Sequence, residues 1–171
     1  MRDMDNRSFD SRRIAEGYRK RPWLHKQVIE RIKKDCSIIN SFKNGLDVGC
    51  GAGLSTKGLK LICEKVTGTD ISSEMINICN HLYKDKTYHF YVAKAEETII
   101  PVEKYDIVTA AGVISWVDRE KFLNNASQVM KEQFVMSFTI EMEVRTMTDK
   151  EDKTVLGQGI KNLVNGGGYV V

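Results

Sequence analysis

Four short apolar runs, separated by segments of helical periodicity, dominate the sequence between Gly45 and Met130. They read GLDVG, KVTGTDI, TYHFYVA and YDIVTAAGV, and the last is almost entirely apolar, as in a strand covered on both faces. A strand followed by a helix returns to the same sheet through a right-handed crossover, so the pattern predicts an α/β fold with a mostly parallel sheet. No internal repeat or linker interrupts it, and 171 residues fit a single domain.

The segments between these runs carry helical stripes and capping residues. Ser72 or Ser73 can cap the helix after the second strand, and Asp118 can cap the helix after the fourth. The expected inward faces are Leu54, Gly58, Leu61 and Ile62 in the first helix, Met75, Cys79 and Leu82 in the second, and Phe122, Ala126, Val129 and Met130 in the last. Ahead of the first strand, the spacing of Leu24, Val28 and Ile32 predicts an amphipathic helix from Pro22 to Lys34.

Charge and cysteine content restrict the function classes. Residues 1–34 hold eleven Lys/Arg against five Asp/Glu in a chain of net charge +3. A basic arm can bind nucleic acid, but here the charges fit the wet face of a helix, so a nucleic-acid partner is disfavoured. The cysteines, Cys36, Cys50, Cys63 and Cys79, lack metal-ligand spacing, which favours reduced thiols, a cytoplasmic location and no metal site. No apolar run has the length of a membrane span, and no secretory core is present, so no membrane partner is expected.

Three glycines, Gly49, Gly51 and Gly53, alternate on the turn from the first strand into its helix. They lie at the predicted carboxyl edge of the sheet, where open α/β folds bind ligands, and the missing side chains let a ligand approach backbone N–H groups. Asp70 ends the second strand nineteen residues after Gly51, where a carboxylate can accept both hydroxyls of a ribose. A tight turn would explain glycines alone, whereas the glycines and the acid together predict a nucleoside-bearing ligand.

The glycine spacing distinguishes between nucleoside ligands. A dinucleotide site requires G-x-G-x-x-G, but GCGAGL has leucine at the sixth place, and Asp47 ahead of the loop suits a cationic amino group better than a pyrophosphate. In LDVGCGAG, VTGTDIS and YDIVTAAGVISWVD the sequence resembles the class I S-adenosylmethionine-dependent methyltransferases, particularly their small-molecule branch, and FDSRRIAEGYRKRP resembles the N-terminal cofactor lid of that branch. The resemblance extends over about residues 9–132.

This resemblance implies a Rossmann-like, doubly wound sheet with helices on both faces and S-adenosylmethionine as cofactor. It divides one methyltransferase domain, 1–171, into a helical lid (1–43), a cofactor-binding core (44–132) and a C-terminal strand and tail (133–171). The implied cofactor residues are Asp47, Gly49, Cys50, Gly51 and Gly53 for the methionine end, Asp70 for the ribose, Ile71, Met75, Ala95 and Glu96 for the adenine, Ala111 and Gly112 for the sulfonium side, and Tyr18 and Arg21 for the lid. Lys94 stands where many relatives carry an acid, which argues against an adenine amino contact from that position.

Methyl transfer from a sulfonium needs little beyond alignment of the acceptor with the methyl group. If the acceptor must lose a proton, His25 near the lid is a weak candidate for the base. Trp116 is a weak candidate for a face toward the cationic cofactor, although a packing role is commoner for such a residue. The favoured function is methyl transfer to a small molecule. Two alternatives stay open: a cofactor-binding module without catalysis, and an RNA methyltransferase that uses the basic arm.

The C-terminal part departs from the family pattern. Apolar residues alternate with mostly polar ones from Phe134 to Val144, which is typical of a strand with one wet face. This alternation predicts a late antiparallel strand, and no glycine turn precedes it as expected for a fifth parallel strand. We therefore expect a segment to be missing between about Lys131 and Phe134, beside the cofactor edge.

Overall fold

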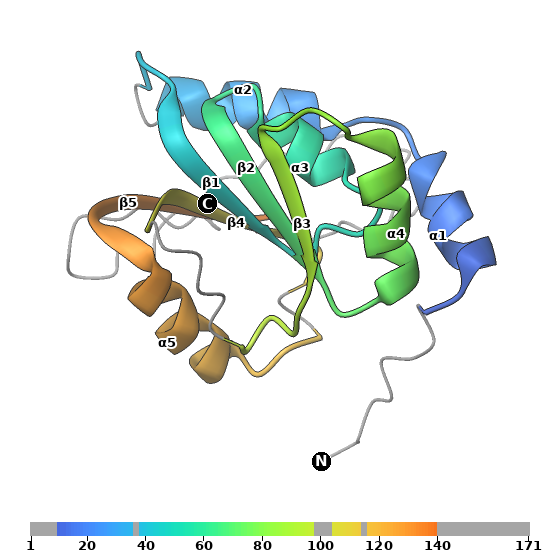
Figure 1. Cartoon of the computed structure of the whole chain (residues 1–171). Helices are drawn as coiled ribbons and strands as arrows, with labels where there is room; N and C mark the ends of the chain where they lie inside the picture. The colour runs from blue at the N-terminus through green and yellow to red at the C-terminus, as the bar shows by residue number, and fades with distance from the viewer. Residues whose placement is uncertain (1–9, 36–37, 98–103, 114–115, 140–171) are drawn as a thin grey trace, which may run out of the picture.

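A five-stranded parallel sheet forms the centre of the molecule (Figure 1). The computed structural model describes residues 10–35, 38–97, 104–113 and 116–139. The strands are β1 (Phe42–Val48), β2 (Cys63–Asp70), β3 (Tyr88–Val92), β4 (Tyr105–Ala111) and β5 (Met130–Thr139), in the order β3-β2-β1-β4-β5. All neighbouring pairs are parallel. The chain winds outward from β1 to β3 and then returns to the other side of β1, so the switch point where such sheets bind ligands lies between β1 and β4.

Helices cover both faces of this sheet, as Figure 1 shows. They are α1 (Arg12–Arg19), α2 (His25–Asp35), α3 (Leu54–Leu59), α4 (Ser73–Leu82) and α5 (Arg119–Val129). On one face α2, α3 and α4 pack on the strands, with α1 against α4; α5 covers the other face. The predicted α/β, doubly wound, Rossmann-like fold is confirmed. None of the described helices is long and apolar enough to cross a bilayer.

The alternation of side chains along β1 separates the two halves of the core. Leu46 and Val48 point toward α5 and pack with Val108 of β4 and Phe122 of α5. The opposite face packs Ile29 and Ile32 of α2 against Leu59, Ile62, Val66 and Ile107. Burying a side chain of this size stabilises the fold by about 1.5–3 kcal/mol. Strand β4 therefore carries apolar side chains on both faces, Val108 on one and Ile107 on the other, which is why its sequence reads as a nearly continuous apolar run.

Two predicted helix caps are confirmed. The Ser72 hydroxyl accepts the Met75 N–H at the start of α4, and the Asp118 carboxylate accepts the Lys121 N–H at the start of α5. The inward face predicted for the last helix, from Phe122 to Met130, is buried as expected.

Helix α2, which was predicted to begin at Pro22, begins later, at His25. Trp23 donates its indole N–H to the Leu54 carbonyl oxygen (3.0 Å), and the Leu24 N–H donates to the Pro22 carbonyl, so these residues form a turn before the helix. As a result Leu24 is 59% exposed. Ile29 joins Ile32 on the buried face instead, because the tertiary contact of Trp23 shifts the helix start.

Two other predicted helical stripes are partly wrong. Helix α3 ends at Leu59, which is buried, and Leu61 in the turn beyond it is exposed. Leu82, at the last position of α4, is also exposed, whereas Met75 and Cys79 are buried as predicted. Both misplaced residues lie at helix ends, where the next segment of chain leaves the core.

The predicted antiparallel strand is wrong in direction. Strand β5 pairs parallel to β4, with Val135 opposite Ile107 and Thr139 opposite Ala111. It begins at Met130, directly after α5, so the fifth parallel strand is present, contrary to the expectation that a missing segment had removed it. Alternation reports that one face of a strand is wet and carries no information on direction. Strand β5 is at the edge of the described sheet, where one-sided burial is expected in either orientation; residues 140–144 lie outside the described residues.

An irregular register takes the place of the missing glycine turn. Met130 of β5 lies opposite Tyr105 of β4, and Val135 lies opposite Ile107. Over this step β5 moves on by five residues while β4 moves on by two. Asp106 lies inside this step, where its Oδ1 accepts the Lys131 Nζ (2.6 Å) and its Oδ2 accepts the Asn44 N–H of β1 (2.8 Å). The extra residues are thus accommodated as a bulge that an ion pair ties to the neighbouring strand.

Candidate functional site

The glycine loop between β1 and α3 has backbone conformations that side chains rarely adopt. Gly49, Gly51 and Gly53 have φ values of 69°, 52° and 87°. A Cβ at Gly49 would overlap the Val113 side chain, and a Cβ at Gly53 would lie 2.5 Å from Tyr83 Cε2. At Gly51 a Cβ would meet only the Tyr18 ring, at 3.5 Å, so the positive φ alone requires glycine there. The glycine turn predicted between the first strand and its helix is present, and the approach of a ligand to its backbone stays a prediction.

Asp70, at the end of β2, holds this loop from the neighbouring strand. Its Oδ2 accepts the Gly51 N–H and its Oδ1 accepts the Ser72 N–H, each at 2.9 Å. Partial burial raises the pKa of Asp70, although these backbone hydrogen bonds act in the opposite direction. Each carboxylate oxygen has a second lone pair, so the half-buried group can accept further hydrogen bonds beside the glycine loop.

Asp47 occupies a different environment, under the first turn of α3. It is 0% exposed; its Oδ2 accepts hydrogen bonds from the hydroxyls of Ser55 (2.6 Å) and Thr56 (2.7 Å), and its Oδ1 from the hydroxyl of Thr109 (2.9 Å). Burial raises the pKa of Asp47 to about 6, because these hydroxyls offset only part of the desolvation cost and the Asp70 charge adds to it. The Asp47 carboxylate thereby links β1 to β4 and α3 behind the loop. Its predicted contact with the methionine end of a cofactor stays a prediction.

Helix α1 lies over the glycine loop and α4. Ala15 is fully buried against Ala52 of the loop and Met75 of α4. The Tyr18 ring lies beside Gly51, and the Arg21 guanidinium stacks on that ring at 3.7 Å from its centroid. The structure thus brings the predicted lid residues to the loop. It places Met75 beneath the lid, with almost no exposed surface, so its predicted contact with adenine is untested.

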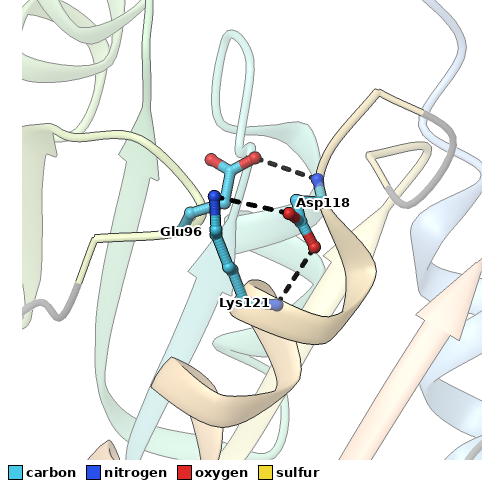
Figure 2. A network of polar contacts seen from close by, with 3 residues as sticks. All are labelled: Glu96, Asp118 and Lys121. Atoms are coloured by element: carbon cyan, nitrogen blue, oxygen red, sulfur yellow. Dashed lines mark hydrogen bonds and ion pairs between the residues drawn. The ribbon is translucent and has the colours of Figure 1, made fainter. Parts of the chain in front are cut away.

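The residues predicted to surround adenine lie on two separate loops. Ile71 follows Asp70, and 41% of its surface is exposed. Ala95 packs on the α5 side of the core. The Glu96 carboxylate accepts the Asp118 N–H (3.1 Å), and the Asp118 carboxylate in turn accepts the Lys121 N–H and pairs with Lys121 Nζ (Figure 2). Glu96 therefore ties the loop after β3 to the start of α5.

The end of β4 reaches the same loop. Gly112 follows Ala111 with a φ of 71°, and the next residue, Val113, places its side chain against Gly49. The ends of β1, β2 and β4 and the lid thus converge on Gly49–Gly53. The described residues contain no group of three or more His, Cys, Asp or Glu side chains arranged to hold a metal ion.

Comparison with known proteins shows which family uses this arrangement. A family model described as a methyltransferase domain matches residues 46–136, more than half of the chain. The chain belongs to this methyltransferase family. Its relatives include an uncharacterized methyltransferase of Schizosaccharomyces pombe, 32% identical over 64% of this chain and 40% of that protein. The mitochondrial ubiquinone biosynthesis O-methyltransferase of Rattus norvegicus is 37% identical over 50% of this chain and 27% of that protein.

Solved structures support the fold. The plantazolicin methyltransferase BpumL, in complex with a monoazolic desmethylPZN analog and S-adenosylhomocysteine, has a TM-score of 0.59 at 19% identity, covering 74% of this chain and 52% of that one. This chain spans less than half the length of the first curated relatives it matches.

The two catalytic candidates have different surroundings in this methyltransferase domain. His25 packs against α3, where its Cβ lies 3.0 Å from the Cβ position of Gly58. Burial lowers the pKa of His25, and its Nδ1 has no hydrogen-bond partner among the described residues. It therefore lies behind α3, away from the ends of β1 and β4. Trp116 is 45% exposed in the turn after β4, and its backbone N–H donates to the Val113 carbonyl oxygen (2.9 Å).

Sequence reasoning named Cys50 as a cofactor residue and Cys79 as a buried helix residue, but it missed the contacts of both with the backbone of the glycine loop. The thiols of Cys50 and Cys79 both point at the Gly51 carbonyl oxygen, at 3.6 and 3.2 Å, and burial raises the pKa of Cys50. The raised pKa of Cys50 argues against a reactive thiolate at that position. The Asp47 hydroxyl partners and the lid residue Asp10 were also missed. The hydroxyls in LSTKGL, directly after the loop, were a local signal for the first of these, because they fall in the first turn of a helix over a buried acid.

Proposed function

We propose that this chain binds S-adenosylmethionine at the Gly49–Gly53 loop and transfers its methyl group to a small-molecule acceptor. The observation that carries the proposal is the hydrogen bond between Gly51 and Asp70, which fixes a glycine turn and a partly exposed carboxylate side by side in a methyltransferase-family chain. The single domain would comprise the lid (1–43), the cofactor-binding core (44–132) and the C-terminal part (133–171), as the sequence suggests.

The residues present fit an adenosine-bearing group. Asp70 keeps one lone pair on each oxygen for two ribose hydroxyls. Gly51 presents bare backbone under the Tyr18 ring, at a position that only glycine adopts without strain. When bound, the cofactor supplies a methyl group on a sulfonium, and the chain orients it: Asp70 holds the ribose, and Arg21, stacked on Tyr18, is placed to pair with a carboxylate.

A small-molecule acceptor is supported by the relatives. Ubiquinone biosynthesis O-methyltransferases and a malonyl-[acyl-carrier protein] O-methyltransferase of Calditerrivibrio nitroreducens, 26% identical to this chain, are among them. His25 packs against Gly58 of α3 rather than at the glycine loop, so alignment of the acceptor by the loop and lid, and not proton transfer to His25, carries the proposed reaction.

The first test is calorimetry on the full chain with S-adenosylhomocysteine and with NAD. We expect binding of the former and none of the latter, because the G-x-G-x-G loop provides no pyrophosphate cradle. Asp70→Ala should weaken binding by about 1–3 kcal/mol, since it removes the ribose acceptor. The matched control is Asp85→Ala; Asp85 is an exposed acid beyond the opposite end of α4, and its carboxylate accepts hydrogen bonds from the N–H and the hydroxyl of Thr87. Unchanged affinity in the Asp70 variant, or tight binding of NAD, contradicts the assignment.

A second test separates the enzymatic functions. Labelled S-adenosylmethionine is incubated with the chain and either a small-molecule extract or total RNA, and the label is followed into products. Label in the small-molecule fraction supports the proposal, and label in RNA supports the alternative that uses the basic arm. Binding of cofactor without any labelled product identifies a binding module.

A further inference from the structure

The lid is fastened to the domain core by a residue with no assigned role. Asp10 lies just ahead of Ser11, the residue that caps α1, and its side chain reaches the start of α4. Its Oδ1 accepts hydrogen bonds from the Ser72 hydroxyl (2.9 Å), the Glu74 N–H (3.3 Å) and the Ser73 hydroxyl (3.4 Å). These partners are 62 to 64 residues away in sequence, so the contact is tertiary.

Asp10 completes the cap of α4. The Ser72 hydroxyl accepts the Met75 N–H, which leaves the Glu74 N–H in the first turn without a partner in its own helix. Asp10 accepts that N–H, and it also accepts the only proton that the Ser72 hydroxyl can donate. A negative charge at this end of a helix is favourable, and the same hydrogen bonds, that from Ser72 first, lower the pKa of Asp10.

Ser72 connects the Asp10 contact to Asp70, the acid proposed to bind the ribose. Ser72 is buried, and while its hydroxyl donates to Asp10, its backbone N–H donates to Asp70 Oδ1. Asp70 Oδ2 accepts the Gly51 N–H. A continuous series of hydrogen bonds therefore runs from the lid through Ser72 and Asp70 to the glycine loop.

The far end of α1 meets the same loop directly. Tyr18 follows Asp10 by eight residues, about 12 Å along a helix, and its ring lies against Gly51. Between the two ends, Ala15 packs on Ala52 and Met75. Figure 1 shows α1 lying beside α4 as this double attachment requires. Ile14 and Tyr18 pack on the same cluster, so apolar contacts hold the middle and the far end of α1 while Asp10 fastens its N-terminal end.

We propose that Asp10 is a positioning residue that fastens the lid to the start of α4 and thereby slows release of the adenosine-bearing cofactor. The inference rests on the proposed function for the identity of the ligand. The lid attachment itself does not depend on the identity of the ligand and can be tested without it. Asp10 acts through Ser72 and Asp70 and through the placement of Tyr18.

The test compares the full chain with Asp10→Ala, Asp10→Asn and the control Asp85→Ala. Asn retains an oxygen that can accept the same three hydrogen bonds, whereas Ala retains none. Amide hydrogen exchange is first measured without ligand. We expect exchange at residues 12–19 to accelerate about tenfold or more in Asp10→Ala, with β1 and β4 unchanged and with Asp10→Asn close to the unmodified chain. Unchanged exchange in α1, or equal acceleration throughout the sheet, overturns the proposal, since the latter would mean a general loss of stability.

Dissociation of S-adenosylhomocysteine is then followed by surface plasmon resonance. We expect about tenfold faster release from Asp10→Ala, largely restored in Asp10→Asn, and no change in Asp85→Ala. Equal release rates in Asp10→Ala and the unmodified chain overturn the positioning role, as does an Asn variant that behaves like the Ala variant. If the unmodified chain does not bind S-adenosylhomocysteine, the proposed function fails, while the exchange experiment still decides whether Asp10 fastens the lid.

Discussion

Replacing Asp47 with asparagine removes an ionisable group that has no contact with solvent. Burial raises the pKa of this carboxyl from 3.8 to about 6, and the three hydroxyl donors offset only part of that effect. The difference of roughly 2 pKa units corresponds to about 3 kcal/mol between the protonated and ionised forms in the folded chain. No discount for solvent screening applies, because Asp47 is 0% exposed.

The sign follows from proton binding. Between pH 3.8 and about 6 the folded chain holds a proton on Asp47 that the unfolded chain has lost. The contribution of this group to the free energy of unfolding is therefore fully present below about pH 3.8 and is lost as pH rises through about 6. Asp47→Asn has no such contribution. The free energy of unfolding of the original chain minus that of the variant should fall by up to about 3 kcal/mol between pH 4 and pH 7.

Urea denaturation, followed by tryptophan fluorescence at half-unit pH steps without ligand, measures this difference. Asp85→Asn is the matched control; hydrogen bonds from Thr87 lower the pKa of Asp85, so its difference curve should have the opposite slope or none. A difference curve for Asp47→Asn that is flat, or that rises with pH, refutes the reasoning.

Three further predictions follow from the glycine loop, the lid and the bulge in β5. Gly53→Ala should lower the free energy of unfolding by about 1–3 kcal/mol, because φ is 87° and Tyr83 blocks the Cβ. In contrast Gly17→Ala, inside α1 with no atom within 4 Å of its Cβ position, should raise that free energy by about 0.5–1 kcal/mol; thermal unfolding of both variants checks the pair. Lys131→Met should lower the free energy of unfolding by about 1 kcal/mol or less, since the Lys131 side chain is 39% exposed. A double-mutant cycle with Asp106→Asn should show a coupling energy between the two residues, and additive effects would contradict the ion pair.

The strands and caps were predictable because their signals are local. A parallel strand covered on both faces must be apolar along its length, and YDIVTAAGV satisfies this requirement without reference to any other segment. Ser72 and Asp118 cap helices through hydrogen bonds that span three residues. The meeting of Gly51 and Asp70 was also predictable, because consecutive parallel strands end at the same edge of the sheet.

The contacts that sequence reasoning missed are tertiary. Nothing near Asp10 in the sequence indicates that its carboxylate caps α4, since its partners are 62 or more residues away. The late start of α2 depends on Trp23, which reaches the Leu54 carbonyl oxygen of α3. The direction of β5 failed for a different reason: alternation measures the burial of faces, and an edge strand can have one covered face in either direction.

Asp47 and Asp70, the two acids beside the glycine loop, differ in access to solvent, and this difference divides their roles. Asp47 and Asp70 end neighbouring strands, yet Asp47 has three hydroxyl partners and no exposed surface, while Asp70 has two backbone partners and remains partly open. A group that water cannot reach changes stability and its dependence on pH, whereas a group with free lone pairs at the surface changes ligand affinity.

If a cationic amino group does bind near Asp47, it must also stabilise the ionised form of that carboxyl, so binding near pH 6 should release a proton. Calorimetry of S-adenosylhomocysteine binding in two buffers of different ionisation enthalpy measures that proton. A binding enthalpy independent of buffer in the original chain would show that the amino group does not bind near Asp47, and would leave Asp70 as the acid that meets the cofactor.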